Sequence, residues 1–286
     1  MLQRLKRAEM TPRRVKALYY LVMRIPMRIN GMIYRAFRHP TAPVRVHFGP
    51  GKKRYLEGWI NLDANFITAK IDLWANLLDP LPFRDSSVEL FYSFHVIEHL
   101  PDAYLPQHFK DMYRCLRPGG GVRVGGPDVG NACRKYLEGD LDWFSDFPDR
   151  RESIGGRFTN FVFCQGEHLT ALSHSYLREL AQEAGFTDIR FCIPSRESDL
   201  IGPEVMAMEE ESDLSCPHSI VMEARKPLHP TRTPSGSDER RPDPRPGGAH
   251  GPNPHTLPRP GAPRLAGTQG AGPRRVPYLG ALWPEA

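Results

Sequence analysis

Glycine, aspartate and histidine stand directly after three short apolar runs of the chain. Gly49 and Gly51 follow the run Val44–Phe48, Asp63 follows a second run, and His95 follows a third. Glycines at such a place let the backbone approach a ligand closely. A carboxylate there can accept hydrogen bonds from both hydroxyls of a ribose, and a histidine, which titrates near neutral pH, can act as a general base. Together these residue types favour a nucleoside-containing ligand beside a reacting group.

The segments that must position these residues alternate between strand-like and helix-like patterns. Apolar and β-branched runs predict strands at Val44–Phe48, Trp59–Leu62, Val88–Phe94, Gly121–Val124, Ile189–Ile193 and Ser219–Ala224. Apolar residues at helical spacing predict helices at Leu105–Leu116 and Ser175–Ala184, each followed by glycine as a stop signal. This alternation predicts an α/β fold, with a Rossmann-like, mostly parallel sheet and helices on both faces. Ligands bind such a sheet outside the carboxyl ends of its strands.

The order of several motifs resembles a known family. The chain contains HFGPG (47–51), GWINLD (58–63), IDL (71–73), LPFRDSSVELFYSFHVIEHL (81–100) and LRPGG (116–120). A lone Gly-x-Gly motif is weak evidence for a nucleotide-binding site, but this ordered set of motifs is specific. It resembles class I S-adenosylmethionine-dependent methyltransferases, and most closely the broad methyltransferase type 11 group. The resemblance extends from Val44 to Pro227.

The resemblance implies that the cofactor is S-adenosyl-L-methionine. The glycine loop would lie against its methionine part, Asp63 would hold the ribose, and Asp72 would accept from the adenine amine. Glu98 and His99 belong to the same signature, and we expect them to order the following segment rather than to react. The expected cofactor-binding residues are Phe48, Gly49, Gly51, Asp63, Asp72, Leu73, Ser93, Phe94 and His95.

The connection after the glycine loop is short. Only seven residues, Lys52 to Gly58, separate the loop from the second expected strand, whereas a parallel crossover normally needs a dozen or more. We therefore expect a shortened first crossover with an incomplete first helix. The cofactor would then lose much of the positive end of a helix dipole, and Lys52, Lys53 and Arg54 could supply charge in its place.

Methyl transfer from a sulfonium mainly requires that the acceptor be aligned in line with the methyl group. A neutral alcohol or amine also needs a general base with a pKa near the working pH. The histidine candidates for this role are His95, His168 and His174. The five cysteines are scattered without C-x-x-C spacing, so we expect neither a metal site nor a disulfide framework. This cysteine usage suits the cytoplasm.

Charge divides the chain into three parts, which we interpret as a basic amphipathic helical extension (1–40), a methyltransferase domain (41–227) and a disordered tail (228–286). The formal net charge is +9 over residues 1–40, −8 over 41–226 and +4 over 227–286. The last 60 residues contain 14 Pro and 9 Gly, a composition that cannot bury enough apolar area to fold.

The extension allows two interpretations. Pro12 could open a helix, Pro26 would end or kink it, and a second amphipathic stretch is expected at Ile29–Phe37. Basic residues beside aliphatic ones are typical of a helix on a membrane surface. The alternative is a helix that packs on the domain and keeps its basic side chains in water. No apolar run is long enough for a transmembrane helix, and we expect no signal peptide.

These observations favour a cytoplasmic enzyme that methylates a small-molecule or glycan acceptor. The acceptor could be lipid-linked, with peripheral contact to the inner face of the membrane through residues 1–40. An RNA or protein methyltransferase is an alternative, but the acidic central region argues against nucleic acid because phosphate contacts dominate such binding. A non-catalytic binding module with the same fold is the third alternative.

Overall fold

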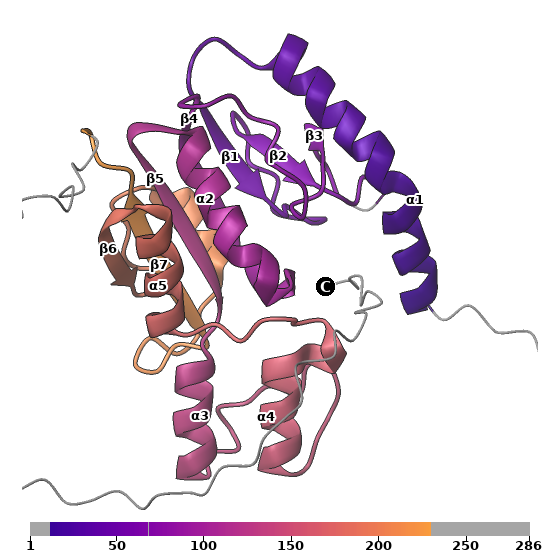
Figure 1. Ribbon diagram of the computed structural model, residues 1–286. Coiled ribbons are helices and arrows are strands. Elements are labelled where there is room, and N and C mark those ends of the chain that lie inside the picture. Colours follow the sequence, from indigo (N-terminus) through magenta and orange to yellow (C-terminus); the bar gives the residue numbers. More distant parts are fainter. Residues whose placement is uncertain (1–11, 68, 230–286) are drawn as a thin grey trace, which may run out of the picture. The chain divides into compact units, whose positions relative to one another are not determined.

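The protein is described here from a computed structural model, which covers residues 12–67 and 69–229 (Figure 1). The predicted disordered tail, apart from its first two residues, and the first 11 residues lie outside this range. In chain order the main elements are α1 (Pro12–Ile33), a π-helical turn (Tyr34–Arg38), β1 (Val44–Phe48), β2 (Ile60–Asp63), β3 (Leu73–Trp74), β4 (Val88–Phe94), α2 (Leu105–Cys115), β5 (Leu116–Pro127), α3 (Val129–Glu138), α4 (Ile154–Phe163), α5 (His174–Ala184), β6 (Thr187–Cys192), α6 (Pro203–Met206) and β7 (Ser219–Arg225).

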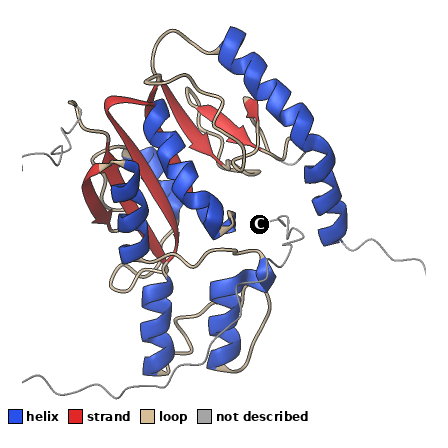
Figure 2. Ribbon diagram, in the orientation of Figure 1, coloured by secondary structure: helices blue, strands red, loops and turns tan. Residues whose placement is uncertain are grey.

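One seven-stranded sheet organises the fold, in the order β3-β2-β1-β4-β5-β7-β6 (Figure 2). All of its pairings are parallel except those of β7, which runs antiparallel to both β5 and β6. Strand order reverses between β1 and β4, and this switch point is where open α/β sheets bind ligands. The predicted Rossmann-like sheet of the class I methyltransferase type is confirmed.

Helices α2 and α5 cover one face of the sheet. On α2, Leu105, Phe109 and Met112 recur at helical spacing, and each is fully buried. They pack in a large core that also contains Phe48 and Phe91, whose rings stack at 5.2 Å. The predicted helix over 105–116 is therefore present, although it ends at Cys115 and β5 begins at Leu116, before the predicted stop signal.

The opposite face is covered mainly by loops and the four-residue helix α6. Tyr92 and Phe94 of β4 point to this face and pack with Leu56, Val205 and Val221. The predicted shortening of the first crossover is confirmed, because no helix lies between Phe48 and Ile60. A loop and a short helix thus take the place that a full crossover helix would occupy.

Side-chain hydrogen bonds from Asn61 hold the short crossover in place. Its Oδ1 accepts from the Leu56 backbone N at 3.0 Å, and its Nδ2 donates to the Leu56 carbonyl at 2.8 Å. Asn61 is fully buried in β2, so these bonds tie the loop to the sheet where helix packing is missing.

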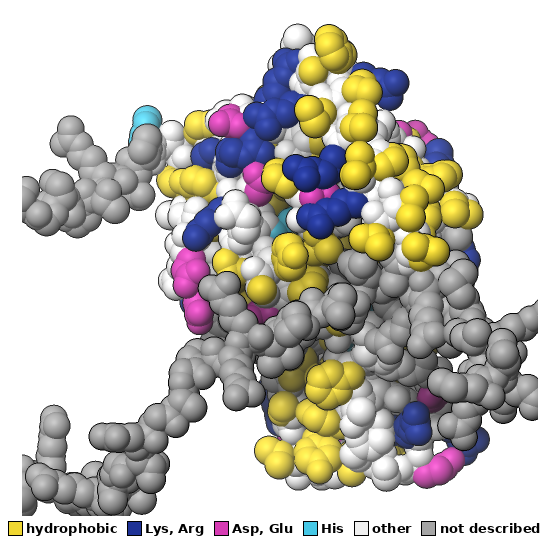
Figure 3. Space-filling model, turned by 45° about the vertical axis from the view of Figure 1, so that its right-hand side comes forward, with side chains coloured by type: hydrophobic (Ala, Val, Ile, Leu, Met, Phe, Trp, Pro, Cys, Tyr) yellow, Lys and Arg dark blue, Asp and Glu magenta, His cyan; other side chains and the backbone are white. Residues whose placement is uncertain are grey.

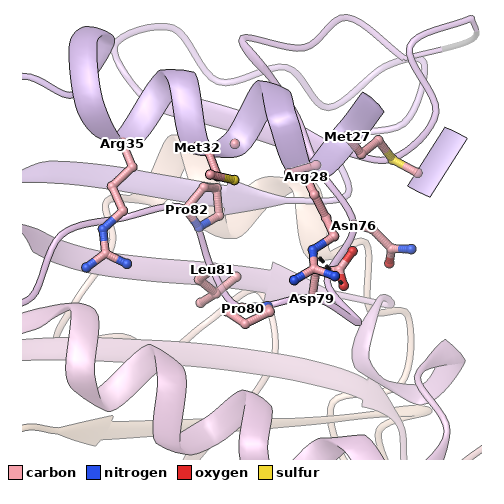
Figure 4. Close-up of a pocket in the computed structure, with 11 residues that line it drawn as sticks. Met27, Arg28, Met32, Arg35, Asn76, Asp79, Pro80, Leu81 and Pro82 are labelled. Carbon is pink, nitrogen blue, oxygen red and sulfur yellow. Dashed lines mark ion pairs between the residues drawn. The ribbon is translucent and has the colours of Figure 1, made fainter. Parts of the chain in front are cut away.

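Helix α1 packs along the β3 edge of the sheet. The Tyr19 hydroxyl donates to the Ala64 carbonyl at 3.0 Å, and Asn30 Nδ2 donates to the Trp74 carbonyl at 2.8 Å. Met27 is 1% exposed. Figure 4 shows a small pocket of about 150 Å³ on this contact, where the Arg28 side chain points toward Asp79, 3.8 Å away.

Of the two outcomes expected at Pro26, an end or a kink of the helix, the end is wrong. Helix α1 continues through Pro26 to Ile33. Proline removes one backbone hydrogen bond from a helix interior, but Pro26 lies on an exposed position, and the contacts of Tyr19 and Asn30 fix the helix on both sides of it. Within residues 12–67 and 69–229, none of the helices is long and apolar enough to cross a membrane.

Candidate functional site

A cleft of about 730 Å³ opens at the carboxyl ends of β1 and β4. The glycine loop after β1 and the His95–His99 segment after β4 line it, together with parts of the α4 region and of the loop before β7. The cleft therefore lies at the switch point of the sheet, where the sequence predicted a ligand site.

Two glycines shape the loop after β1 for different reasons. Gly49 has a φ of +62°, and a Cβ on it would lie 2.5 Å from Val96 Cγ2. Gly51 has a φ of +53° but open space around it. Only Gly49 is thus required by close packing as well as by its backbone conformation. The three basic residues that follow also line the cleft, and the Arg54 guanidinium lies 5.8 Å from the centre of the Phe94 ring.

The two residues predicted to bind the ribose and the adenine, Asp63 and Asp72, do not line the cleft. Asp63 ends β2, where its Oδ1 accepts from the Asn65 backbone N at 2.8 Å. Asp72 accepts at Oδ2 from the backbone N and the Nδ2 of Asn61, and at Oδ1 from the Tyr55 hydroxyl, each at 2.9 Å. The Asp72 carboxylate is thus engaged in holding the short crossover. The cofactor-binding roles of Asp63 and Asp72 stay predictions.

Three other predicted cofactor residues are buried in strands. Phe48, Leu73 and Ser93 are at most 1% exposed, and none of them lines the cleft. Gly49, Gly51, Phe94 and His95 do line it. The structure therefore brings the loop glycines together with the residues at the end of β4, and their contact with a cofactor stays a prediction.

His95 has a well-defined set of partners. Its φ is +56°, a conformation that is uncommon outside glycine and is often found at functional sites. Its Nδ1 lies 3.1 Å from Glu98 Oε1, and its Nε2 lies 3.1 Å from Ser219 Oγ at the start of β7. Burial opposes ionisation of Glu98, but the hydrogen bond from His95 and the nearby His99 and His168 rings hold the Glu98 pKa below its ordinary value.

Of the other two candidate bases, only His168 reaches the cleft. Its Nδ1 lies 3.2 Å from the Val162 carbonyl, and burial lowers its pKa. His174 is the first residue of α5, with a side chain that is 56% exposed and lies 3.9 Å from Asp128 Oδ2. The structure thus brings His95 and His168 to one cleft but leaves His174 outside it. Which histidine acts as a base stays a prediction.

Sequence reasoning missed a group of three side chains at the same cleft. Glu98, His99 and His168 each offer a ligand atom, and these atoms lie within 4.8 Å of one another. We expected no metal site because the cysteines lack metal-binding spacing. His168 is about 70 positions from Glu98 in the chain, so no local pattern could have indicated the group.

Sequence reasoning also missed the residues that the segment before β7 brings to the cleft. His218 stacks on Trp143 with ring centres 4.3 Å apart, and its Nδ1 lies 2.9 Å from Glu211 Oε1. This hydrogen bond raises the pKa of His218. Burial would raise the pKa of Glu211, but the hydrogen bonds from His218 and from the Ser219 backbone hold it below its ordinary value.

The sequence was compared with models of known protein families and with curated proteins. Residues 60–124 match the sequence model of a family described as a methyltransferase domain. No curated protein matches the chain.

Several solved structures are similar to the chain. A S-adenosylmethionine-dependent methyltransferase from Archaeoglobus fulgidus has 14% identity and a TM-score of 0.42, over 73% of this chain and 100% of that one. A possible histamine N-methyltransferase from Thermotoga maritima has 18% identity and a TM-score of 0.40, over 73% and 93%. Phosphoethanolamine N-methyltransferase 2 from Haemonchus contortus, solved with S-adenosyl-L-methionine, has 15% identity and a TM-score of 0.40, over 78% and 59%.

Because these identities and TM-scores are low, the fold is assigned from the order and direction of the strands. The family match over 60–124 covers β2 to β5 and includes the HVIEHL and LRPGG motifs. It confirms the predicted resemblance, and with it the enzyme class and the cofactor.

Proposed function

We propose that this S-adenosylmethionine-dependent methyltransferase acts on a small-molecule or glycan acceptor, in the cytoplasm and at the surface of a membrane. The acceptor would enter the cleft between the glycine loop and His95 and receive the methyl group by in-line transfer. The observation that carries the proposal is this cleft, because its volume of about 730 Å³ lies within the range of sites that enclose small molecules, roughly 300–1,000 Å³.

The charges of the cleft support a small acceptor over a nucleic acid. Glu98, Glu167 and the acidic residues 209–211 line it. Carboxylates repel the phosphates that supply most of the affinity for RNA. The three basic residues of the glycine loop lie on the same cleft but are outnumbered by these acids.

The His95–Glu98 pair supports a general base. If Nδ1 of His95 donates to Glu98 Oε1, its Nε2 is unprotonated and can accept the proton of an acceptor hydroxyl or amine. Nε2 lies next to the Ser219 hydroxyl, which can rotate away when an acceptor binds. Glu98 is then a positioning residue that fixes the tautomer of the base.

The exposed face of α1 supports contact with a membrane. Seven apolar side chains recur at helical spacing on this face, and each is between 42% and 69% exposed: Leu18, Leu21, Val22, Ile25, Ile29, Met32 and Ile33. At 3.6 residues per turn they lie opposite the buried Met27 and Tyr34. Exposed arginines accompany them at positions 24, 28, 35 and 38. Figure 3 shows hydrophobic side chains beside Lys and Arg side chains on this side of the molecule.

An apolar stripe with flanking arginines matches a surface of anionic lipids in both hydrophobicity and charge. The other side of the same helix is fixed to the domain by Tyr19, Asn30 and the Arg24–Asp79 ion pair at 3.1 Å. Both interpretations of the extension are thus compatible, because one side of α1 packs on the domain while the other is left for lipid.

Calorimetric titration of the full chain with S-adenosylmethionine and S-adenosylhomocysteine tests the cofactor part of the proposal. We expect binding by the wild-type protein, loss of binding in Asp63→Ala, and wild-type binding in Glu179→Ala, which changes an exposed carboxylate on α5. A folded wild-type protein that binds neither ligand would contradict the proposal and favour a non-catalytic module.

Co-sedimentation with vesicles tests the membrane part. We expect the wild-type protein to bind vesicles of phosphatidylcholine with phosphatidylglycerol more strongly than phosphatidylcholine alone, and the Ile25→Glu/Ile29→Glu variant to remain in the supernatant. Leu137→Glu, on an 83% exposed residue of α3, should bind like the wild type. Equal binding by all three proteins would exclude α1 as the contact.

A further inference from the structure

Glu98, His99 and His168 meet at the cleft in an arrangement that goes beyond the ordering role expected from the sequence. Glu98 and His99 belong to the turn Ile97–His99 after β4, and His168 follows α4. The three ligand atoms that they offer all lie within 4.8 Å of one another. In particular, His99 Nε2 is 3.9 Å from Glu98 Oε1. We propose that these three side chains form a binding site for a divalent transition-metal ion.

Backbone carbonyls orient both imidazole rings. His99 Nδ1 lies 3.1 Å from the Glu167 carbonyl, and His168 Nδ1 lies 3.2 Å from the Val162 carbonyl. A carbonyl only accepts hydrogen bonds, so each Nδ1 is a donor, and in the neutral ring Nε2 is the nitrogen that can bind an ion. A hydrogen bond from Nδ1 to a backbone carbonyl is a contact that fixes metal-binding histidines in their ligating tautomer.

The Glu98 carboxylate supplies a buried negative charge to the group. Glu98 is 1% exposed, and among the described residues its Oε2 makes no hydrogen bond. A buried carboxylate with an unsatisfied oxygen is costly, and a bound cation would compensate it. A Cβ on Gly126 would lie 3.0 Å from Oε2, so the absence of a side chain there leaves room for the carboxylate.

The donor set selects the kind of metal. Two imidazole nitrogens and one carboxylate oxygen suit Zn²⁺, Mn²⁺, Fe²⁺ or Co²⁺, whereas Mg²⁺ and Ca²⁺ prefer oxygen ligands alone. Ligands bound at about 2.0–2.2 Å to a tetrahedral ion lie about 3.4 Å apart. Side-chain movements of about 1 Å therefore close the site around an ion. The remaining coordination positions would face the cleft, which both histidines line.

The site has a role in the proposed methyl transfer, and this role rests on that function. An ion at the cleft would bind an acceptor hydroxyl and lower its pKa. The proton would pass to His95 Nε2, and the acceptor oxygen would form a bond to the methyl carbon. The carbon–sulfur bond would break with its electron pair on sulfur, which gives S-adenosylhomocysteine. No further reactant is required.

Metal titration of the full-length, metal-stripped protein tests the site without any measurement of activity. We expect saturable binding of one Zn²⁺ or Mn²⁺ by calorimetry, a rise in the thermal unfolding temperature with metal, and reversal by EDTA. Co²⁺ would develop visible absorption that reports its coordination geometry. His168→Ala should weaken binding at least about tenfold, because it removes one of three ligands.

Further variants keep the result interpretable. His168 is only partly buried, so its variant should fold even if Glu98→Gln does not. His229→Ala, on an exposed histidine away from the cleft, should bind metal like the wild type. Absence of saturable binding by the folded wild type, or wild-type affinity in both His99→Ala and His168→Ala, would overturn the proposal.

Binding of S-adenosylmethionine measured on the same metal-stripped protein separates the two proposals. If the cofactor binds but no metal does, the metal site is wrong while the methyl-transfer proposal stands. If metal binds but the cofactor does not, the site stands and the methyl-transfer proposal is wrong.

Discussion

Asn61 and Leu56 exchange two hydrogen bonds across the shortened crossover, one at 3.0 Å and one at 2.8 Å. The same Asn61 side chain also donates to Asp72 Oδ2 at 2.9 Å and lies 3.1 Å from His47 Nδ1. A single amide therefore connects β1, β2 and the loops on both sides of β2. This explains how the sheet keeps its parallel order between β1 and β2 without a crossover helix.

Asn61→Ala should lower the free energy of unfolding by about 3 kcal/mol, because it leaves the buried Leu56 N–H without its acceptor, at a cost of about 1–3 kcal/mol, and also removes the bonds to the Leu56 carbonyl and to Asp72. Urea unfolding measures the change. Asn65→Ala is the matched control, because the Asn65 Oδ1 accepts an exposed hydrogen bond from the Ile67 N, and the loss of exposed bonding should cost less than about 1 kcal/mol. Equal costs in the two variants would mean that Asn61 does not hold the crossover.

His108 should make the protein sensitive to acid. It is 4% exposed on α2, and its Nε2 makes no hydrogen bond among the described residues. Burial lowers its pKa from 6.5 to about 4. Between pH 6.5 and pH 4, the unfolded chain binds a proton at this histidine more readily than the folded protein does. The contribution of His108 to the free energy of unfolding is therefore fully retained above pH 6.5 and falls as the pH drops toward 4, by up to about 1.4 kcal/mol per pH unit.

His108→Leu keeps the volume of the side chain close to that of histidine and removes the titrating group. Relative to the wild type, the variant should gain about 2 kcal/mol of stability between pH 7 and pH 5. Chemical unfolding at both pH values gives this difference. His47, whose pKa burial also lowers to about 4, contributes equally in both proteins. An identical pH dependence of the two proteins would show that His108 is not buried as described.

Arg123 holds the segment before β7 against the sheet. It is fully buried, donates to both carboxylate oxygens of Glu209 at 2.7 Å, and donates to Glu223 Oε1 at 2.8 Å. Arg123→Met should cost about 3–5 kcal/mol, because it leaves the buried Glu209 carboxylate without its Arg123 partner and removes one of the two arginines at Glu223, where Arg190 remains at 3.2 Å. Arg117→Met, on an exposed residue 3.5 Å from Glu89, should cost less than about 1 kcal/mol. Thermal and urea unfolding compare them, and similar losses would refute this account.

Gly126 and Gly155 should respond to alanine in opposite directions. A Cβ on Gly126 would lie 2.7 Å from Leu172 Cδ1 and 3.0 Å from Glu98 Oε2, so Gly126→Ala should cost about 1–3 kcal/mol through overpacking. Gly155, in α4, has open space around its Cβ position, so Gly155→Ala should stabilise by up to about 1 kcal/mol. Measured free energies of unfolding of the two variants test these opposite effects. A Gly126→Ala variant as stable as the wild type would mean that Glu98 can move away from the added methyl group.

The sheet could be predicted from the sequence because its signals are local. The run Val88–Phe94 forms β4 over the predicted residues, and Gly185 ends α5 as expected. The glycine loop and His95 were also placed correctly at one end of the sheet, because parallel strands bring their carboxyl ends to the same edge.

The site could be predicted only in part, because its other contacts are not local. Asp72 occupies a position of the family motif that predicts adenine binding. Its carboxylate instead accepts hydrogen bonds from Asn61 and Tyr55, which no motif indicated. His218 and the acidic residues before β7 reach the cleft because β7 is inserted beside β5. Pro26 was expected to end or kink α1, but the helix continues to Ile33, because tertiary contacts on both sides of Pro26 outweigh the loss of one backbone bond.

The position of β7 sets the order in which the sheet can be completed. Among the described strands β6 pairs only with β7, and residue 192 at its end precedes Arg225 by 33 positions. At about 5–20 residues per second, synthesis of this interval takes about 2–7 s. During that time, newly made β6 has no partner strand, and the edge of β5 is uncovered. The nascent chain therefore passes through a period in which the unpaired edges of β5 and β6 are open to association with other chains. This period ends only when β7 is inserted between β5 and β6.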